Sequence, residues 1–302
     1  MEIGFVGLGR MGRNVVLNLL EKKVRVVAHN RSPEKVREIA KAGAVPAFSP
    51  SELCAKLKSP RVIWLMVTAG APVDEMIAEL LPHLRKGDLL IDGGNSFYKD
   101  SIGRHDSLRS GGIDFLDVGT SGGLGGARHG ACLTIGGEET VFKKAELLFK
   151  LVACKDGYAH VGGAGAGHYV KIIHNGMEYA LLQAYGEGFE ALAQSPYKLD
   201  LPKVAKVWQH GSVIRSWLLE LAQSALEKDP KLERLEGEVG GGETGRWAIG
   251  QAWEAGAPFS SVANAYSARL RSRQKDSFSG KVIAAVRNGF GGHEVTRREG
   301  RK

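Results

Sequence analysis

Three glycines separate the first predicted strand from the first predicted helix, and their spacing constrains the fold of this 302-residue chain more than any other feature. The strand begins at Glu2, and an amphipathic segment from Asn14 to Glu21 follows the turn. The turn itself consists of Gly7, Leu8, Gly9, Arg10, Met11 and Gly12. Glycines with this spacing allow a tight turn, a close approach of the backbone to a pyrophosphate, and close packing of the helix. The pattern therefore predicts a Rossmann-type sheet whose first turn binds a dinucleotide.

The end of the second predicted strand, over residues 24–28, bears on the choice of dinucleotide. An NAD site usually has Asp or Glu at this place, and the carboxylate binds the ribose hydroxyls. This chain has Asn30, Arg31 and Ser32 instead. Because no carboxylate repels it, a 2'-phosphate can be bound by the Arg31 guanidinium and the Ser32 hydroxyl. The sequence therefore favours NADP as the cofactor, with NAD possible.

Strand and helix patterns alternate as far as residue 161, and only helical patterns follow. Further strands are predicted over 61–67, 89–91, 113–118, 131–135 and 158–161, with helices over 33–42 and from residue 49. Later helices are predicted over 201–210, 212–226, 244–255, 259–272 and 279–288. Such an alternation is typical of a parallel sheet covered by helices. We predict an α/β chain, with a Rossmann-type parallel sheet domain over 1–163 and an all-α domain over 164–302.

Two predicted loops follow strands of this sheet. Residues 92–96, which include Asn95, come directly after a strand, where open α/β sheets bind their ligands. A second loop over 119–126 is rich in glycine and contains Ser121, Gly122 and Gly123. Its backbone amides could approach an anion, but a flexible loop without function fits this composition equally well.

A long helix is predicted over 165–188, and its polar residues are unusual. Lys171, His174, Asn175 and Glu178 have the spacing i, i+3, i+4 and i+7, which puts them on one face. An apolar stripe elsewhere on the helix consists of Val170, Ile173, Met177, Ala180, Leu181 and Ala184. The stripe predicts a mostly buried helix. The alternative is a polar face that is merely exposed to solvent. However, His-Asn-Gly in the middle of a helix lowers the helix propensity, which favours a functional role for the base, imidazole, amide and acid on this face.

Composition and charge narrow the class of protein. The three cysteines form no CxxC pair, so we expect reduced thiols in the cytoplasm. A strand that begins by Ile3 leaves no room for a leader, and no apolar run is long enough to span a membrane. The net charge of +8 is spread along the whole chain without interleaved aromatic residues, which favours a small anionic substrate over nucleic acid. No cluster of metal ligands is evident, so we expect no metal.

Seven stretches of the chain together closely resemble the 6-phosphogluconate dehydrogenase family, in its short bacterial form, and the resemblance covers essentially the whole chain. They are GLGRMG at 7–12, NRS at 30–32, IDGGNS at 91–96, SGG at 121–123, GHYVKIIHNGMEY at 167–179, SAR at 267–269 and RNGFGGH at 287–293. The stretch around Lys171 is the most specific of them. The resemblance implies oxidative decarboxylation of 6-phospho-D-gluconate to ribulose 5-phosphate and CO2 with reduction of NADP or NAD.

The resemblance also implies a role for each matching residue. Lys171 would be the general base and later acid, and Glu178 the acid that protonates the product carbon. The sugar acid would be held by Asn95, Ser121, Gly122, Gly123, His174 and Asn175, and its phosphate end by Tyr179, Arg269, Arg287 and His293. The cofactor would contact residues 7–12 and 30–32, together with Val67, Thr68, Ala69 and Asn95. The long form has a phosphate-binding lysine just before TGKW, whereas this chain has Gly242 and Glu243 before Thr244, so whether Arg246 replaces that lysine stays open.

General chemistry agrees with the implied reaction. Oxidation of a hydroxyl two carbons from a carboxylate gives a β-keto acid, whose carbonyl takes up the electrons released as CO2 leaves, so no metal is needed. A lysine can act as the base near neutral pH when desolvation or a nearby cation lowers its pKa.

The resemblance further implies a homodimer or homotetramer in which Arg287 and His293 of one chain reach the site of its neighbour. The helical domain would then serve both substrate binding and dimerisation. Two other functions stay open. One is another β-hydroxyacid dehydrogenase, of the 3-hydroxyisobutyrate or tartronate semialdehyde type, although that reaction needs no proton delivery from Glu178. The other is a catalytically silent dinucleotide-binding module.

Overall fold

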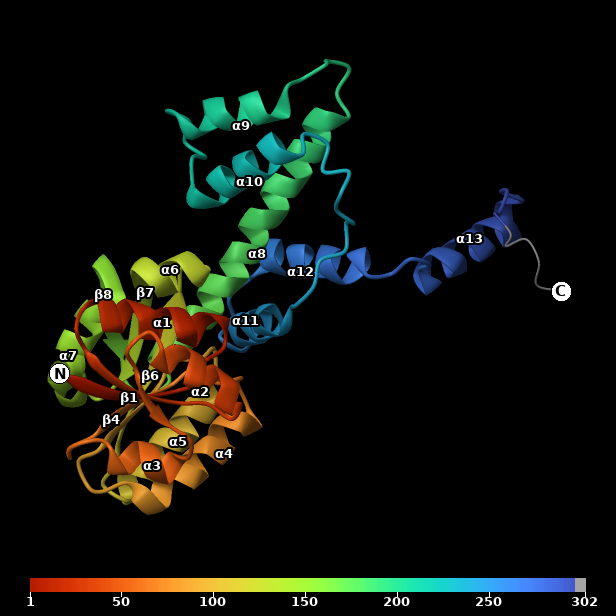
Figure 1. The fold of residues 1–302 in the computed structure, drawn as a ribbon. Coiled ribbons are helices and arrows are strands. Elements are labelled where there is room, and N and C mark those ends of the chain that lie inside the picture. The colour runs from red at the N-terminus through yellow and green to blue at the C-terminus, as the bar shows by residue number, and fades with distance from the viewer. Residues whose placement is uncertain (297–302) are drawn as a thin grey trace. The chain divides into compact units, whose positions relative to one another are not determined.

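The structure is a computed structural model that describes residues 1–296, except for the side chain of residue 290 (Figure 1). The chain divides into two compact units, Met1–Asn175 and Gly176–Lys302. The division falls inside one long helix, α8 (Ala166–Ala193). The domain boundary predicted at residue 163 lies just before this helix and stays a proposal.

An eight-stranded sheet with the order β3-β2-β1-β4-β5-β6-β7-β8 forms the centre of the first unit. The strands are β1 (Glu2–Val6), β2 (Arg25–His29), β3 (Val45–Ala47), β4 (Val62–Leu65), β5 (Leu89–Asp92), β6 (Asp114–Ser121), β7 (Ala131–Gly137) and β8 (Ala153–Gly162). The strand order reverses between β1 and β4, so the loops after these strands lie at a topological switch point, where open sheets bind ligands. The predicted Rossmann-type sheet is confirmed.

Pairing is parallel from β3 to β6, but β7 runs antiparallel to β6. The strand and helix patterns of the sequence did not predict this reversal. The reason is the short helix α6 (Gly123–His129), which turns the chain back after β6 instead of crossing the sheet. The predicted glycine loop over 119–126 is therefore wrong, since its first three residues end β6, Gly122 caps α6 and the rest belong to α6.

Helices cover both faces of the sheet (Figure 1). One apolar core includes residues of α1 (Arg10–Glu21), α2 (Pro33–Ala40), α6 and α7 (Glu139–Val152). The other core includes residues of α3 (Pro50–Ala55), α4 (Ala71–Leu80) and α5 (Tyr98–Ser110), with a 3-10 turn, η1 (Leu81–His83), after α4. The central strands β4 and β5 are buried on both faces, as their nearly continuous apolar sequences predict.

The second unit is helical, as predicted. After the second part of α8 come α9 (Leu201–Gln209), α10 (Trp217–Lys228), α11 (Glu243–Glu254), α12 (Ser260–Ser272) and α13 (Phe278–Gly291). A small core forms where Tyr185 and Phe189 of α8 pack against Ala205, Leu219 and Leu226. Gly176 has no room for a side chain, because a Cβ there would lie 2.9 Å from Ala248 and 3.1 Å from Phe259. Close packing therefore explains the glycine in the middle of α8.

The burial predicted for α8 is wrong in part. Met177 is 55% exposed and Leu181 51% exposed, although both belong to the predicted apolar stripe. His168 and Lys171 are buried instead, because the first turns of α8 lie against β6 and β7 with their polar side chains inward. No helix in the part of the chain that the structure describes is both long enough and apolar enough to cross a membrane.

Candidate active site

In the first unit, Lys171, Ser121 and His174 contact one another. Lys171 Nζ donates a hydrogen bond to Ser121 Oγ and lies 3.3 Å from His174 Nδ1. His174 Nε2 lies 3.3 Å from the same Ser121 oxygen. The neighbouring Asn175 Oδ1 is 3.2 Å from His174 Nδ1. The predicted base is thus brought together with three of the residues predicted to hold the sugar acid.

Burial and hydrogen bonding together restrict Lys171. Its relative exposure is only 7%, so the amine has a defined position at the end of β6. If His174 Nδ1 accepts from Nζ, the hydrogen of the imidazole is on Nε2 and is donated to Ser121 Oγ. The Ser121 hydroxyl hydrogen is then directed to another acceptor, such as a substrate oxygen.

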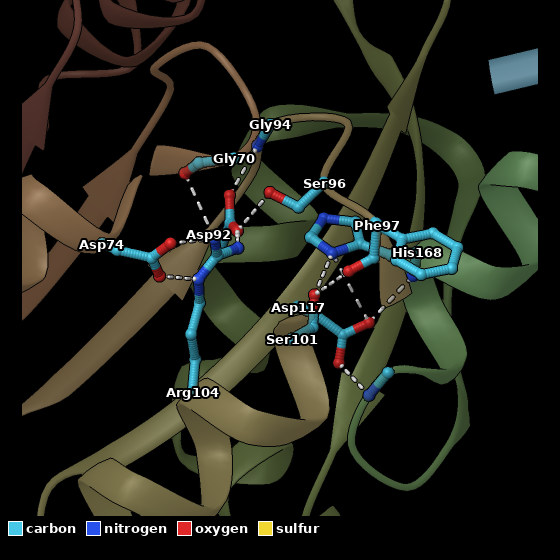
Figure 2. A network of polar contacts seen from close by, with 11 residues as sticks. Gly70, Asp74, Asp92, Gly94, Ser96, Phe97, Ser101, Arg104, Asp117 and His168 are labelled. Carbon is cyan, nitrogen blue, oxygen red and sulfur yellow. Dashed lines mark hydrogen bonds and ion pairs between the residues drawn. The ribbon is translucent and has the colours of Figure 1, made fainter. Parts of the chain in front are cut away.

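The loop after β5, which carries Asn95, is held in place by buried contacts. Asp92 is fully buried and accepts hydrogen bonds from Gly94 N at 3.1 Å and Ser96 Oγ at 2.7 Å, which Figure 2 shows. Gly93 must lack a side chain, because a Cβ there would lie 1.9 Å from Trp64 Nε1. These contacts fix both sides of Asn95, whose own side chain is exposed.

The glycine turn fits a dinucleotide. A Cβ on Gly7, whose φ is +99°, would lie 2.3 Å from Met66 O, and one on Gly12 would lie 2.0 Å from Gly7 O. A Cβ on Gly9 would meet no other atom within 4 Å. Two glycines are therefore needed for the turn and for helix packing, and the third leaves room where a pyrophosphate would approach. Helix α1 begins at Arg10 with no acidic residue in its first turn, so its positive end is not neutralised there.

Asn30 holds this turn as well as flanking the predicted ribose site. Its Oδ1 accepts a hydrogen bond from Leu8 N at 2.8 Å, and its Nδ2 lies 3.4 Å from Ser32 O. Arg31 is exposed, and the Ser32 hydroxyl does not cap α2 within the described chain. The guanidinium of Arg31 and the hydroxyl of Ser32 are therefore accessible beside the turn. Val67, Thr68 and Ala69 follow β4 on the other side of the switch point.

Tyr179 organises the predicted phosphate residues of the second unit. The Arg269 guanidinium stacks on its ring at 3.7 Å from the centroid, and Thr244 Oγ1 lies 3.3 Å from its hydroxyl. On Gly245 a Cβ would lie 2.4 Å from the ring, so the glycine before Arg246 is required by packing. Arg269 Nη1 also donates to Gly240 O at 3.3 Å. The ring thus orients one cation beside the glycine-rich loop.

The remaining predicted residues also lie in the second unit. Glu178 is half-buried on α8, two turns after Lys171 on the same helix. Arg246 has a 66% exposed side chain, 3.9 Å from Glu243. Arg287 is an exposed residue of α13, and His293 follows that helix, with its carbonyl accepting from Asn288 Nδ2 at 2.8 Å. Among the described residues, no group of three or more His, Cys, Asp and Glu side chains could hold a metal ion.

Several buried polar residues near the site were missed by the sequence analysis. Arg104 on α5 lies between Asp74 and Asp92, with Nε 2.6 Å from Asp74 Oδ1 and Nη1 3.3 Å from Asp92 Oδ2 (Figure 2). Asp117 and His168 form a second buried group. The available signal was a single acidic residue at the end of, or inside, an apolar strand, since charged residues are rarely buried unless they are paired.

Known proteins resemble this chain in sequence and in domain content. Residues 2–162 match the family described as the NAD binding domain of 6-phosphogluconate dehydrogenase, and residues 189–301 match its C-terminal domain. An NAD(+)-dependent decarboxylating 6-phosphogluconate dehydrogenase of Haloferax volcanii is 45% identical over 301 residues, covering 99% of this chain and 100% of the relative. A Saccharomyces cerevisiae decarboxylating 6-phosphogluconate dehydrogenase is 38% identical, covering 91% of this chain but 59% of the relative.

A solved structure resembles the chain over its full length. The Plasmodium falciparum 6-phosphogluconate dehydrogenase, determined in apo form and with NADP+ or 6-phosphogluconate, matches with a TM-score of 0.84 and 28% identity. The match covers 100% of this chain and 67% of that one. Sequence, domain content and fold agree in this assignment, and the chain belongs to the 6-phosphogluconate dehydrogenase family.

Proposed function

We propose that this chain catalyses the oxidative decarboxylation of 6-phospho-D-gluconate to ribulose 5-phosphate and CO2, with NADP or NAD as oxidant and without a metal. The observation that most supports this proposal is the contact of buried Lys171 with Ser121 and His174 at the end of β6. A buried amine beside a hydroxyl and an imidazole suits a base that takes a proton from a bound sugar hydroxyl. We place the reaction in the cytoplasm, as expected from the reduced cysteines.

The oxidation step uses the sheet unit. A nicotinamide cofactor bound at the glycine turn would supply the acceptor for the hydride of the substrate carbon. Lys171 takes the proton of the hydroxyl on that carbon, so the alcohol becomes a ketone and the amine becomes an ammonium. Ser121 and His174 keep the amine at a fixed place, which favours reaction geometry. Asn95 and the backbone of Gly122 and Gly123 would orient the carboxylate end.

The decarboxylation step begins from this β-keto acid. The carbon–carbon bond to the carboxylate breaks, CO2 leaves, and the electron pair moves onto the ketone oxygen. The Lys171 ammonium stabilises this developing charge and donates its proton to the oxygen, which gives an enol. Glu178 then protonates the carbon that lost CO2, and Lys171 takes back the hydroxyl proton as the product ketone forms.

Substrate phosphate is assigned to the cations of the second unit. Arg269 is oriented by stacking on Tyr179, and a guanidinium binds phosphate through paired hydrogen bonds. Arg246 is exposed and could add a second cation in place of the lysine of the long form.

The cofactor is proposed to be NADP, with NAD as a possible substitute. Arg31 and Ser32 are accessible and could bind a 2'-phosphate. The Haloferax relative is named as NAD(+)-dependent, whereas the Plasmodium structure contains NADP+, so family members differ in this property.

A substrate assay tests the proposal. The purified protein should reduce NADP, and NAD less efficiently, with 6-phosphogluconate, and CO2 should be released in equal amount. The alternative β-hydroxyacid dehydrogenase would instead act on 3-hydroxyisobutyrate or tartronate semialdehyde, with no CO2. Cofactor binding without turnover of any of these substrates would indicate a silent module.

We also propose that the protein is a homodimer or homotetramer in which Arg287 and His293 complete the site of a neighbouring chain. Exposed Val282, Ile283 and Val286 on α13 support this, because an apolar helix face is usually covered by a partner. Mixing inactive Lys171→Met with inactive Arg287→Ala tests it. After random subunit exchange, about a quarter of the wild-type activity should return, since half the dimers are mixed and each mixed dimer has one intact site. No recovery after proven exchange would place Arg287 in its own chain's site.

A further inference from the structure

We propose that Asp117 is a positioning residue that sets the place of Lys171 through the first turns of α8. The inference rests on the proposed function, because it assigns Asp117 a part in the same proton transfer. Asp117 lies in β6 and is fully buried. It does not touch the predicted substrate or cofactor residues through any contact that the described chain records, so its effect on turnover must act through the helix.

The Asp117 carboxylate binds the start of α8 at two points. Oδ1 accepts a hydrogen bond from Gly165 N at 2.7 Å, and Oδ2 accepts one from His168 N at 2.8 Å. These are N–H groups of the helix start, which have no carbonyl partner within the helix. A negative charge at this end also interacts favourably with the helix dipole. Lys171 follows His168 by one turn, so the carboxylate fixes the depth and the rotation of the helix at the catalytic amine.

Glycines allow the helix to approach β6 and β7 closely. A Cβ on Gly119 would lie 2.4 Å from Lys171 Cβ, and one on Gly136 would lie 2.5 Å from Asp117 Oδ1. On Gly167 a Cβ would lie 2.4 Å from Asp117 O. No side chain larger than hydrogen therefore separates the helix from the strands at these three places. The position of Lys171 therefore depends on close contacts that do not allow the helix to shift, since packed interiors do not deform continuously.

A side-chain contact from Thr134 adds to these close approaches. We refer to the residues that hold the start of α8 as the seat of the helix; they are Asp117, Gly119, Thr134, Gly136 and Gly167. Thr134 Oγ1 donates to Gly167 O at 2.9 Å from the neighbouring strand. Asp117 binds N–H groups and Thr134 binds a carbonyl, so the two strands hold opposite polar groups of the same turn.

The seat is also connected to the loop that presents Asn95. His168 Nδ1 lies 2.7 Å from Ser101 Oγ on α5, whose first turn follows that loop (Figure 2). Asp117 is the paired neighbour of Asp92 on β5, and Asp92 binds both sides of Asn95. Two adjacent buried carboxylates thus hold the two elements that carry Lys171 and Asn95. The base and a predicted ligand of the substrate share one rigid support.

The first test compares Asp117→Asn with Asp114→Asn. Asparagine keeps the shape of Asp117 but replaces one accepting oxygen with a donor, which would face an N–H group. Asp114 is a matched control, since it begins the same strand and its carboxylate lies 3.6 Å from Lys144 Nζ, at the opposite end from the site. We expect Asp117→Asn to lower kcat about 30-fold while KM and the NADP dissociation constant change less than about threefold, because a small displacement of a catalytic group suffices. Asp114→Asn should leave kcat unchanged.

A double-mutant cycle separates positioning from loss of stability. If Asp117 acts only through Lys171, Asp117→Asn added to Lys171→Met should lower the residual kcat less than twofold further, because the base is already absent. An equal 30-fold loss in both backgrounds would overturn the proposal, and so would wild-type kcat in folded Asp117→Asn.

A milder variant covers the case in which Asp117→Asn does not fold. Thr134→Val keeps the volume and removes the donor to Gly167, and we expect about a fivefold loss of kcat that again disappears in the Lys171→Met background. Unchanged kcat in Thr134→Val would then overturn the proposal. Failure of the proposed function looks different, since it would appear as an inactive wild-type protein or an active Lys171→Met.

Discussion

The two halves of α8 are held in different ways. Residues up to Asn175 are attached to β6 and β7 through buried polar contacts, and Lys171 is 7% exposed. From Gly176 onward the helix packs through small and aromatic residues, and Met177 and Leu181 are about half exposed. The difference indicates that the proposed base is fixed by the sheet, whereas the proposed acid and phosphate-binding residues belong to a helical unit with a small core and exposed apolar faces.

The largest expected effect concerns the sheet-bound half. Lys171→Met should lower kcat about 10³-fold or more, because the base and the later acid are both lost. NADP binding should stay within about twofold, since the glycine turn follows β1, which is three strands away from β6 in the sheet. Steady-state kinetics and cofactor fluorescence measure the two quantities, with the exposed Lys155→Met as control. More than about a tenth of the wild-type activity would exclude Lys171 as the base.

Glu178→Gln sharpens the comparison from the helical half. The amide cannot deliver a proton to carbon, so we expect overall turnover to fall about 10²-fold while the first hydride transfer is affected less. Stopped-flow reduction of the cofactor, compared with CO2 release and product formation, separates these steps. Glu187→Gln, at an exposed site of the same helix, is the control. Equal losses in all steps would contradict separate roles for Lys171 and Glu178.

Asn30→Asp tests the cofactor turn, which has no counterpart in the helical half. The new carboxylate can still accept from Leu8 N, but it would repel both Ser32 O and a 2'-phosphate. We expect the ratio of kcat/KM for NADP to that for NAD to fall about tenfold. Arg31→Ala should weaken NADP and leave NAD nearly unchanged. A native enzyme that already prefers NAD would refute the interpretation of residues 30–32.

The smallest effect is expected for Gly245→Ala. The added methyl would press on the Tyr179 ring, which we expect to cost about 1–3 kcal/mol of the free energy of unfolding. The KM for 6-phosphogluconate should rise several-fold, because Arg269 stacks on that ring. Gly250→Ala is a matched control on the same helix, since a Cβ there has open space within 4 Å. A stable Gly245→Ala with unchanged KM would separate Tyr179 from phosphate binding.

Much of the fold followed from local patterns. Alternating strand and helix segments predicted the Rossmann-type sheet, and the glycine turn was placed correctly because Gly7 and Gly12 each meet a local steric demand. Helix α8 was predicted from its periodicity, and its proposed functional residues from chemistry and family resemblance. The direction of β7 could not be predicted, because it depends on how α6 returns the chain.

Burial along α8 shows the limit of such patterns. A periodic apolar stripe predicts which residues can be buried, but not which neighbours are available to cover them. In this chain Asp117, Gly119 and Ser121 of β6 contact the helix, so the polar side of its first turns faces inward.

The sequence by itself determined the family, the class of fold, and the residue types that can bind a dinucleotide and transfer protons, because these depend on local spacing and on the chemistry of single side chains. Only the tertiary structure decided that Asp92 and Asp117 are neighbours, and that one binds the loop after β5 and the other the start of α8. The physical reason is that a buried carboxylate is stable only with partners, and those partners come from segments far apart in the chain.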